Sequence, residues 1–123
     1  MCLTQIWVSF VTDSCLFCRI ASGEIPATLV GQNEHAVAFR DIHPQAPVHL
    51  LVIPRRHVAS LAEATDAVEV GALCLLAAEV ARQEGVAETG YRVVMNTGAD
   101  GGQTVSHLHL HLLAGRRMTW PPG

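Results

Sequence analysis

The sequence has no excess of positive charge and no long hydrophobic run. Its 123 residues carry a formal net charge of −3 with histidine counted as neutral, so no global positive field would attract nucleic acid. The Arg55-Arg56 and Arg116-Arg117 pairs are short, and we expect them to be solvated surface. No apolar segment approaches the roughly 18 residues that span a bilayer. We therefore expect neither a nucleic-acid partner nor a membrane partner.

Cysteine is also scarce. The four cysteines are too few and too unevenly spaced for the disulfide framework of a small secreted protein, which favours a reducing cytoplasm. Residues 1–12 are apolar but contain no lysine or arginine, whereas a secretory signal begins with a basic segment. We expect them to form a variable N-terminal extension. Residues 13–123 should form one domain, because hydrophobic residues make up 50% of the chain and its length leaves little room for two cores.

Two helices are expected from the pattern of caps and breakers. A short helix should cover residues 14–21, before a glycine and a proline end it. A long helix should cover residues 66–84, because Asp66 and Glu69 form a capping-box pattern and Gly85 is placed to terminate it. Its buried face should contain the apolar residues that recur at helical spacing, namely Val70, Leu73, Cys74, Ala77, Val80 and Ala81.

Five strands complete the pattern of an α+β domain. The first two should form a hairpin, and a glycine-rich loop over residues 98–102 should precede the last. Because the strands are grouped around one long helix instead of alternating with helices, we predict an antiparallel five-stranded sheet. The strands are expected at residues 28–32, 36–40, 48–53, 91–96 and 106–113.

Histidine and leucine alternate strictly from His107 to Leu112. Successive side chains of a strand point to opposite faces, so the leucines would face the core, and His107, His109 and His111 would share the other face. Neighbouring rings would lie about 6.6 Å apart and the outer pair about 13 Å apart, too far for one metal ion to bind all three comfortably. Three titratable rings on one face have no ordinary packing reason, which indicates chemistry.

A phosphate group suits this row of imidazoles better than a metal ion does. The central ring can attack phosphorus as a nucleophile while its neighbours donate hydrogen bonds to oxygens that gain charge. An unperturbed pKa of about 6.5 leaves much of the attacking ring neutral at physiological pH. The glycines of the preceding loop permit close approach of the backbone to an anion, and Asn96 and Thr104 flank them with side-chain donors. The loop contains no Gly-Lys-Ser/Thr element, so it is not a P-loop.

Residues 107–113 resemble the signature of the histidine triad superfamily, which is His-x-His-x-His followed by apolar residues. The resemblance covers about residues 15–123 and includes the segments 39–42, 47–54, 96–98 and 120–123. His111 stands where the dinucleoside-polyphosphate hydrolase and nucleotidyltransferase branches usually carry glutamine, so the chain looks like the Hint branch. Hint proteins are purine nucleotide-binding homodimers, with sheets that pair across the dimer. They hydrolyse nucleoside phosphoramidates, such as adenosine monophosphate joined to an amine, without metal in the chemistry.

The resemblance implies a role for each histidine. His109 would be the nucleophile that forms a nucleotidyl-histidine intermediate, from which water releases the nucleotide. His107 and His111 would support the α-phosphate. His49 would be a partner of the triad, although a histidine satisfied in the core is an equal interpretation. Further contacts to the phosphate or the leaving group would come from Asn96, Thr104 and the backbone at Gly102.

The resemblance also implies a nucleoside pocket. Asp41 would accept hydrogen bonds from the ribose hydroxyls, unless it is a solvated turn acid. Trp120, in the Trp-Pro-Pro-Gly ending, would reach the active site of the partner in a homodimer, unless the terminus is free. An apolar slot for the base would be formed by residues that are equally consistent with ordinary core packing, namely Phe17, Ile20, Phe39 and Ile42.

Cys15 and Cys18 form a pair that resembles bacterial members of the family, in which zinc is commonly held. The matching ligands here would be Cys15, Cys18, His57 and His107, a set suited to a closed, structural, tetrahedral zinc site. A redox pair and two unliganded thiols are the alternatives. If His107 binds zinc, it cannot also donate to phosphate from the same nitrogen. No organic cofactor is expected.

Several functions stay open at this point. A nucleoside phosphoramidate hydrolase, a nucleotide-binding sensor without relevant turnover and a metal-dependent hydrolase all fit the sequence. A dinucleoside polyphosphate hydrolase is a further alternative within the family. Substitution of His109 separates the first two, and chelation separates the third.

Overall fold

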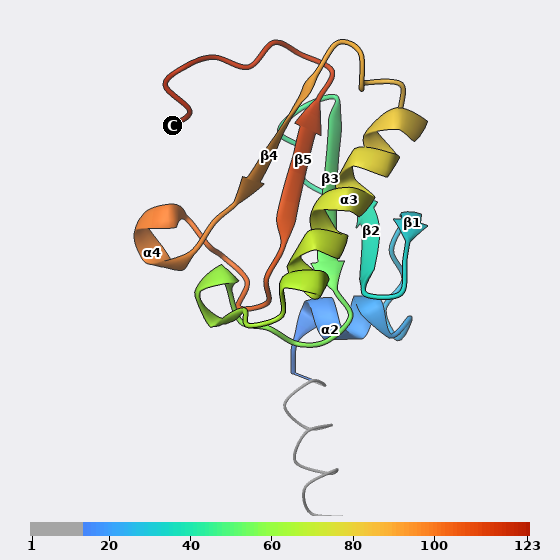
Figure 1. Ribbon diagram of the computed structural model, residues 1–123, viewed down its shortest axis with the longest axis vertical. Helices are drawn as coiled ribbons and strands as arrows, with labels where there is room; N and C mark the ends of the chain where they lie inside the picture. Colours follow the sequence, from blue (N-terminus) through green and yellow to red (C-terminus); the bar gives the residue numbers. More distant parts are fainter. Residues whose placement is uncertain (1–13) are drawn as a thin grey trace, which may run out of the picture.

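An antiparallel sheet of five strands is the centre of the fold (Figure 1). The computed structural model describes residues 14–123, so the expected extension over residues 1–12 lies outside the described residues. The predicted α+β class with one antiparallel sheet is confirmed. The strand order is β1-β2-β3-β5-β4, with β1 at Leu29–Gln32, β2 at Ala36–Arg40, β3 at Val48–Pro54, β4 at Tyr91–Met95 and β5 at Leu110–Ala114.

The long helix α3 (Ala67–Gln83) lies across one face of the sheet (Figure 1). Its start is confirmed, because the Asp66 carboxylate accepts hydrogen bonds from the amides of Val68 and Glu69. Cys74 is exposed, which contradicts the prediction that it is buried. The buried stripe of α3 runs through Leu73 and the residues three and four positions further on, and each helical step turns the side chain by about 100°, so position 74 faces solvent. Within residues 14–123, no helix combines the length and hydrophobicity needed to cross a membrane.

The two faces of the sheet carry different clusters. Leu108, Leu110 and Leu112 belong to the large core under α3. The opposite face carries a smaller cluster around Phe17, which lies in the short helix α2 (Leu16–Ala21). The histidines project to this second face: the ring centroid of Phe17 lies 5.9 Å from that of His107 and 5.2 Å from that of His109. The alternation of histidine and leucine therefore separates the two faces as predicted.

Strand β5 is shorter than predicted at its start. The prediction placed the strand from residue 106, but β5 begins at Leu110, opposite Val52 of β3. The amide of Leu108 donates instead to the carbonyl of Val58, a residue beyond the end of β3. His107 and His109 thus precede the regular ladder, although their side chains keep the alternation of an extended chain.

Two short helices were not predicted. The 3-10 helix η1 covers Leu61–Glu63, and α4 covers Gly98–Gly101, where the sequence indicated a glycine-rich loop. Gly102 ends α4 in the left-handed region, with φ of +81°. The side chain of Gln103 closes this turn, because it accepts from the amide of Gly98 and donates to the carbonyl of Ala59. The glycines therefore form a compact helical turn beside the triad.

Gly115 follows β5 at a point where the chain passes closely over Pro47. Its φ is +88°, and a Cβ added there would lie 2.8 Å from the Cβ of Pro47. We expect Gly115→Ala to lower the free energy of unfolding by about 1–3 kcal/mol, because the new methyl group is both strained and overpacked. Gly71→Ala is the control: it lies in α3 with open space around it, so it should raise stability by about 0.5–1 kcal/mol. Urea denaturation measures both, and an unchanged midpoint for Gly115→Ala would contradict the close approach.

Candidate functional site

A cavity of about 650 Å³ opens on the sheet face opposite α3. Its wall includes segments that the sequence analysis missed, chiefly residues 25–28 and His43, which carry no recognisable pattern and are brought there by the tertiary fold. Trp120 lies outside the lining and is 81% exposed. The predicted site residues that line the cavity are Phe17, Ile20, Phe39, Asp41, Ile42, His49, Asn96, Gly102, Thr104, His109 and His111.

A hydrogen bond at Nδ1 orients the ring of His109 and leaves its Nε2 free. Its Nδ1 lies 2.7 Å from the carbonyl oxygen of His107. A carbonyl only accepts, so Nδ1 carries the proton, and Nε2 of the neutral ring carries a lone pair. The ring is buried, and its edge-on neighbours are Phe17 and His111, with centroid separations of 5.2 Å and 5.0 Å. An imidazole held in this way is prepared to act as a nucleophile.

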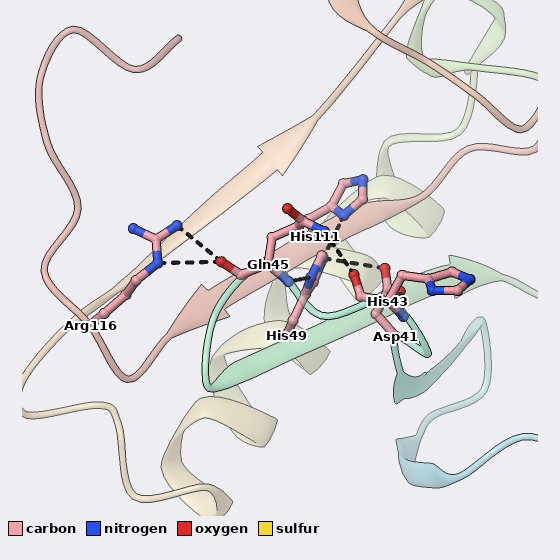
Figure 2. A network of polar contacts seen from close by, with 6 residues as sticks. All are labelled: Asp41, His43, Gln45, His49, His111 and Arg116. Carbon is pink, nitrogen blue, oxygen red and sulfur yellow. Dashed lines mark hydrogen bonds and ion pairs between the residues drawn. The ribbon is translucent and has the colours of Figure 1, made fainter.

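His111 belongs to a polar network with His49 and Asp41 (Figure 2). Nε2 of His49 lies 2.9 Å from Nδ1 of His111 and 3.4 Å from Oδ2 of Asp41. Burial, together with the neighbouring His109 and His49, lowers the pKa of His111 to about 4, while the charge of Asp41 opposes this shift. Burial also lowers the pKa of His49, while the charge of Asp41 opposes this effect. Both rings are therefore neutral at pH 7.

The same three side chains bring possible metal ligands within 4.8 Å of one another. Two nitrogens bound to one tetrahedral ion at the usual bond length would lie roughly 3.3 Å apart. The separation of 2.9 Å between His49 and His111 is shorter and matches a hydrogen bond instead. We therefore interpret this group as a network that shares protons.

Asp41 lies at the polar end of the cavity, directly after β2. Its amide donates to the carbonyl of His49, and its Oδ1 accepts from the amide of His43 at 2.8 Å. The carboxylate is 17% exposed, so it is held in place and still reaches the cavity. The other end of the cavity is apolar. Phe17 and Phe39 meet edge-on there, with ring centroids 5.8 Å apart, whereas Ile42 is 85% exposed at the rim.

A second group of side chains gathers beside the cavity, where α2 meets the end of β3. Sγ of Cys15 and Sγ of Cys18 lie 3.3 Å and 3.4 Å from Nδ1 of His107, and Cys18 lies 3.3 Å from Nδ1 of His57. All four ligand atoms lie within 4.8 Å of one another. In a tetrahedral zinc site, sulfur and nitrogen ligands would be roughly 3.5 Å apart, from the usual bond lengths. The arrangement therefore fits zinc.

The protonation of this group also fits a metal ion. Burial and the neighbouring Cys15 raise the pKa of Cys18 to about 12, because two thiolates side by side in a protein interior are unfavourable without a cation. Burial lowers the pKa of His107 to about 4, so its ring is neutral and offers a lone pair. A divalent ion would supply the charge that both thiolates require.

His107 lies apart from the cavity, although the resemblance implied a role for it at the phosphate. The residue is fully buried and does not line the cavity. Its Nδ1 faces the two thiols, and its Nε2 donates to the carbonyl of Pro54 at 3.0 Å. Both ring nitrogens are therefore engaged. A backbone carbonyl behind a ligating histidine is the usual support of a metal site.

The chain is similar to known proteins in both sequence and fold. A family model described as the HIT domain matches residues 22–118. The chain is 50% identical to a 14 kDa zinc-binding protein of Zea mays over 112 residues, which are 88% of this chain and 87% of that protein. A solved HIT family hydrolase from Legionella pneumophila has a TM-score of 0.85 and 52% identity, with 89% of this chain and 99% of that chain covered.

A solved histidine triad nucleotide-binding protein from Candida albicans is more distant in sequence. It has a TM-score of 0.77 and 30% identity, with 87% of this chain and 82% of that chain covered. The family match, the identities and the superpositions confirm the resemblance predicted from the histidine motif. This chain belongs to the HIT domain family.

Proposed function

We propose that this protein is a purine nucleotide-binding hydrolase that cleaves nucleoside 5′-phosphoramidates through a nucleotidyl-histidine intermediate on His109. The observation that carries the proposal is the orientation of His109, whose Nδ1–H is bound to a carbonyl while the ring lines a cavity with one polar and one apolar end. The names of the solved relatives, a hydrolase and a nucleotide-binding protein, support the class.

The reaction has two steps. In the first, Nε2 of His109 attacks the α-phosphorus, a nitrogen–phosphorus bond forms, and the bond from phosphorus to the amine breaks. The amine leaves with a proton, for which His111 is the adjacent donor in the cavity. In the second step, water attacks the nucleotidyl-histidine and loses a proton, which restores the one that His111 gave to the amine; the bond from phosphorus to His109 breaks, the nucleotide is released, and His109 regains its lone pair. The covalent intermediate divides one difficult displacement into two easier ones.

The cavity suits a nucleotide along its whole length. The Asp41 carboxylate would accept hydrogen bonds from the ribose hydroxyls, and the apolar end would hold the purine between Phe17, Ile20 and Phe39, with Ile42 at the rim. The α-phosphate would lie beside His109, where the remaining polar lining residues are Asn96, Gly102 and Thr104. The bound zinc would be structural, since four protein ligands leave no open position.

We further propose that residues 13–123 act as one HIT domain in a cytoplasmic homodimer. Strand β4 lies at the edge of the sheet, and its residues Tyr91 and Val93 are 38% and 43% exposed. Pairing of two β4 strands would cover these side chains and join the sheets. It would also bring Trp120, which lies outside its own cavity, toward the partner. The free cysteines among the described residues fit a reducing compartment.

Turnover of adenosine 5′-monophosphoramidate tests the proposal. We expect a kcat/KM for this substrate that exceeds the value for diadenosine tetraphosphate by about 100-fold or more, because the proposed reaction takes place at an α-phosphate with a small leaving group. Binding of adenosine monophosphate without turnover of either compound would support the sensor instead. Loss of turnover after chelation, with the fold retained, would support a metal-dependent hydrolase.

A further inference from the structure

Arg116 contacts the loop between Asp41 and His49, which borders the site (Figure 2). It lies in the segment after β5, and its Nε and Nη2 donate to the carbonyl oxygen of Gln45 at 3.3 Å and 3.2 Å. Arg116 and Arg117 are both exposed, as predicted for this pair, and Arg116 also makes this specific contact. The guanidinium group is exposed, but it connects the chain after the triad to the loop between Asp41 and His49.

Gln45 is held at three points. Its carbonyl accepts from Arg116, its side-chain amide donates to the carbonyl of His43 at 3.1 Å, and its backbone amide donates to Nδ1 of His49 at 2.9 Å. Pro47 gives the loop a second support, because the glycine that precedes Arg116 lies directly against it. The backbone of Gln45 therefore has a defined position relative to His49.

The backbone amide of Gln45 determines where His49 carries its proton. A backbone N–H only donates, so Nδ1 of His49 must accept, and the proton of the neutral ring must lie on Nε2. This Nε2 lies 2.9 Å from Nδ1 of His111. The two nitrogens cannot both carry a proton at that distance, so Nδ1 of His111 accepts and its own proton lies on Nε2.

We propose that Arg116 and Gln45 are positioning residues, which fix the tautomers of His49 and His111 through this chain of hydrogen bonds. The result is that His111 offers an Nε2–H donor instead of a second lone pair beside Nε2 of His109. The catalytic consequence rests on the proposed function, in which this donor serves the phosphate oxygens or the leaving amine. The tautomers themselves do not depend on any substrate.

Nitrogen-15 NMR of the imidazoles tests the proposal in the full chain without nucleotide. In the unmodified protein near neutral pH, we expect both His49 and His111 as single Nε2–H tautomers. Arg116→Ala should add the Nδ1–H tautomer of His49, because the loop loses its anchor. Arg116→Lys should restore most of the single tautomer, and Arg117→Ala, which removes the same charge one residue further on, should match the unmodified protein.

A kinetic measurement separates positioning from a purely structural role. Arg116→Ala should lower kcat for the phosphoramidate by about 10-fold and leave KM within about twofold, the range seen when support behind a reacting histidine is lost. Unmodified tautomers in Arg116→Ala would overturn the proposal. If the tautomers respond as expected but the unmodified protein turns over no phosphoramidate, the proposed function fails and the positioning role stands.

Gln45 provides a second pair of variants that does not depend on the arginine. Gln45→Pro removes the amide proton itself, whereas Gln45→Ala keeps it and removes only the side chain. We expect Gln45→Pro to release His49 from its single tautomer even with Arg116 present, and Gln45→Ala to leave that tautomer dominant. Retention of the unmodified tautomers in Gln45→Pro would also overturn the proposal.

Discussion

His109→Ala is expected to lower kcat for adenosine 5′-monophosphoramidate by about four orders of magnitude or more, the scale seen when a covalent nucleophile is removed. The physical reason is that Nε2 of His109 would form the bond to phosphorus, and water cannot replace an imidazole held in this orientation. Intact-mass spectrometry should detect a nucleotidyl adduct on the unmodified protein at early times, and none on the variant. Peptide mapping should place the adduct on His109.

Two controls accompany this variant. His109 is buried against Phe17, so its removal leaves a cavity, and His109→Gln keeps more of the side-chain volume while it removes the nucleophile. His35→Ala makes the same chemical change in the turn between β1 and β2. This position lies outside the lining of the cavity, so turnover should be unchanged. Turnover that survives in His109→Ala, or an adduct on another residue, would show that the covalent mechanism is wrong.

The histidine strand shows how much of the site the sequence contains. Strict alternation separates the leucines from the histidines, and the structure places Leu110 in the core and His109 on the cavity side. Alternation depends only on an extended backbone, so this prediction held even though β5 starts at Leu110. The start of the strand depends on the hydrogen-bond partner that the neighbouring segment of the chain presents, here the carbonyl of Val58 to the amide of Leu108, and no local pattern encodes that.

The different surroundings of the histidines are visible only in the structure. From the alternation alone, His107 and His111 are equivalent neighbours of His109, although the resemblance already placed His107 among the implied zinc ligands. In three dimensions, one is bound to thiols and to the Pro54 carbonyl, while the other meets His49 and lines the cavity. The difference comes from residues far apart in the chain. In the same way, Cys74 has the apolar character and the helical spacing of a core residue, and only the orientation of α3 on the sheet exposes it to solvent.

Removal of the metal centre should have the second largest effect. Zinc content should be close to one ion per chain in the unmodified protein and close to none in Cys18→Ser. We expect this variant to unfold at a temperature lower by about 10 °C or more, because the binding energy of a structural zinc ion contributes to folding, and its loss leaves buried polar groups that no cation balances. Metal analysis and thermal unfolding measure the two effects.

Cys74→Ser is the matched control, since it changes an exposed thiol on α3 and should shift neither the zinc content nor the unfolding temperature. The zinc site would be contradicted if the unmodified protein, as purified, contained no zinc and unfolded at the same temperature as Cys18→Ser.

Loss of the zinc centre should also impair the histidine triad. The carbonyl of His107 orients His109, so a ligand that is no longer held by zinc leaves the nucleophile less well placed, and kcat should fall in Cys18→Ser although every lining residue of the cavity is retained.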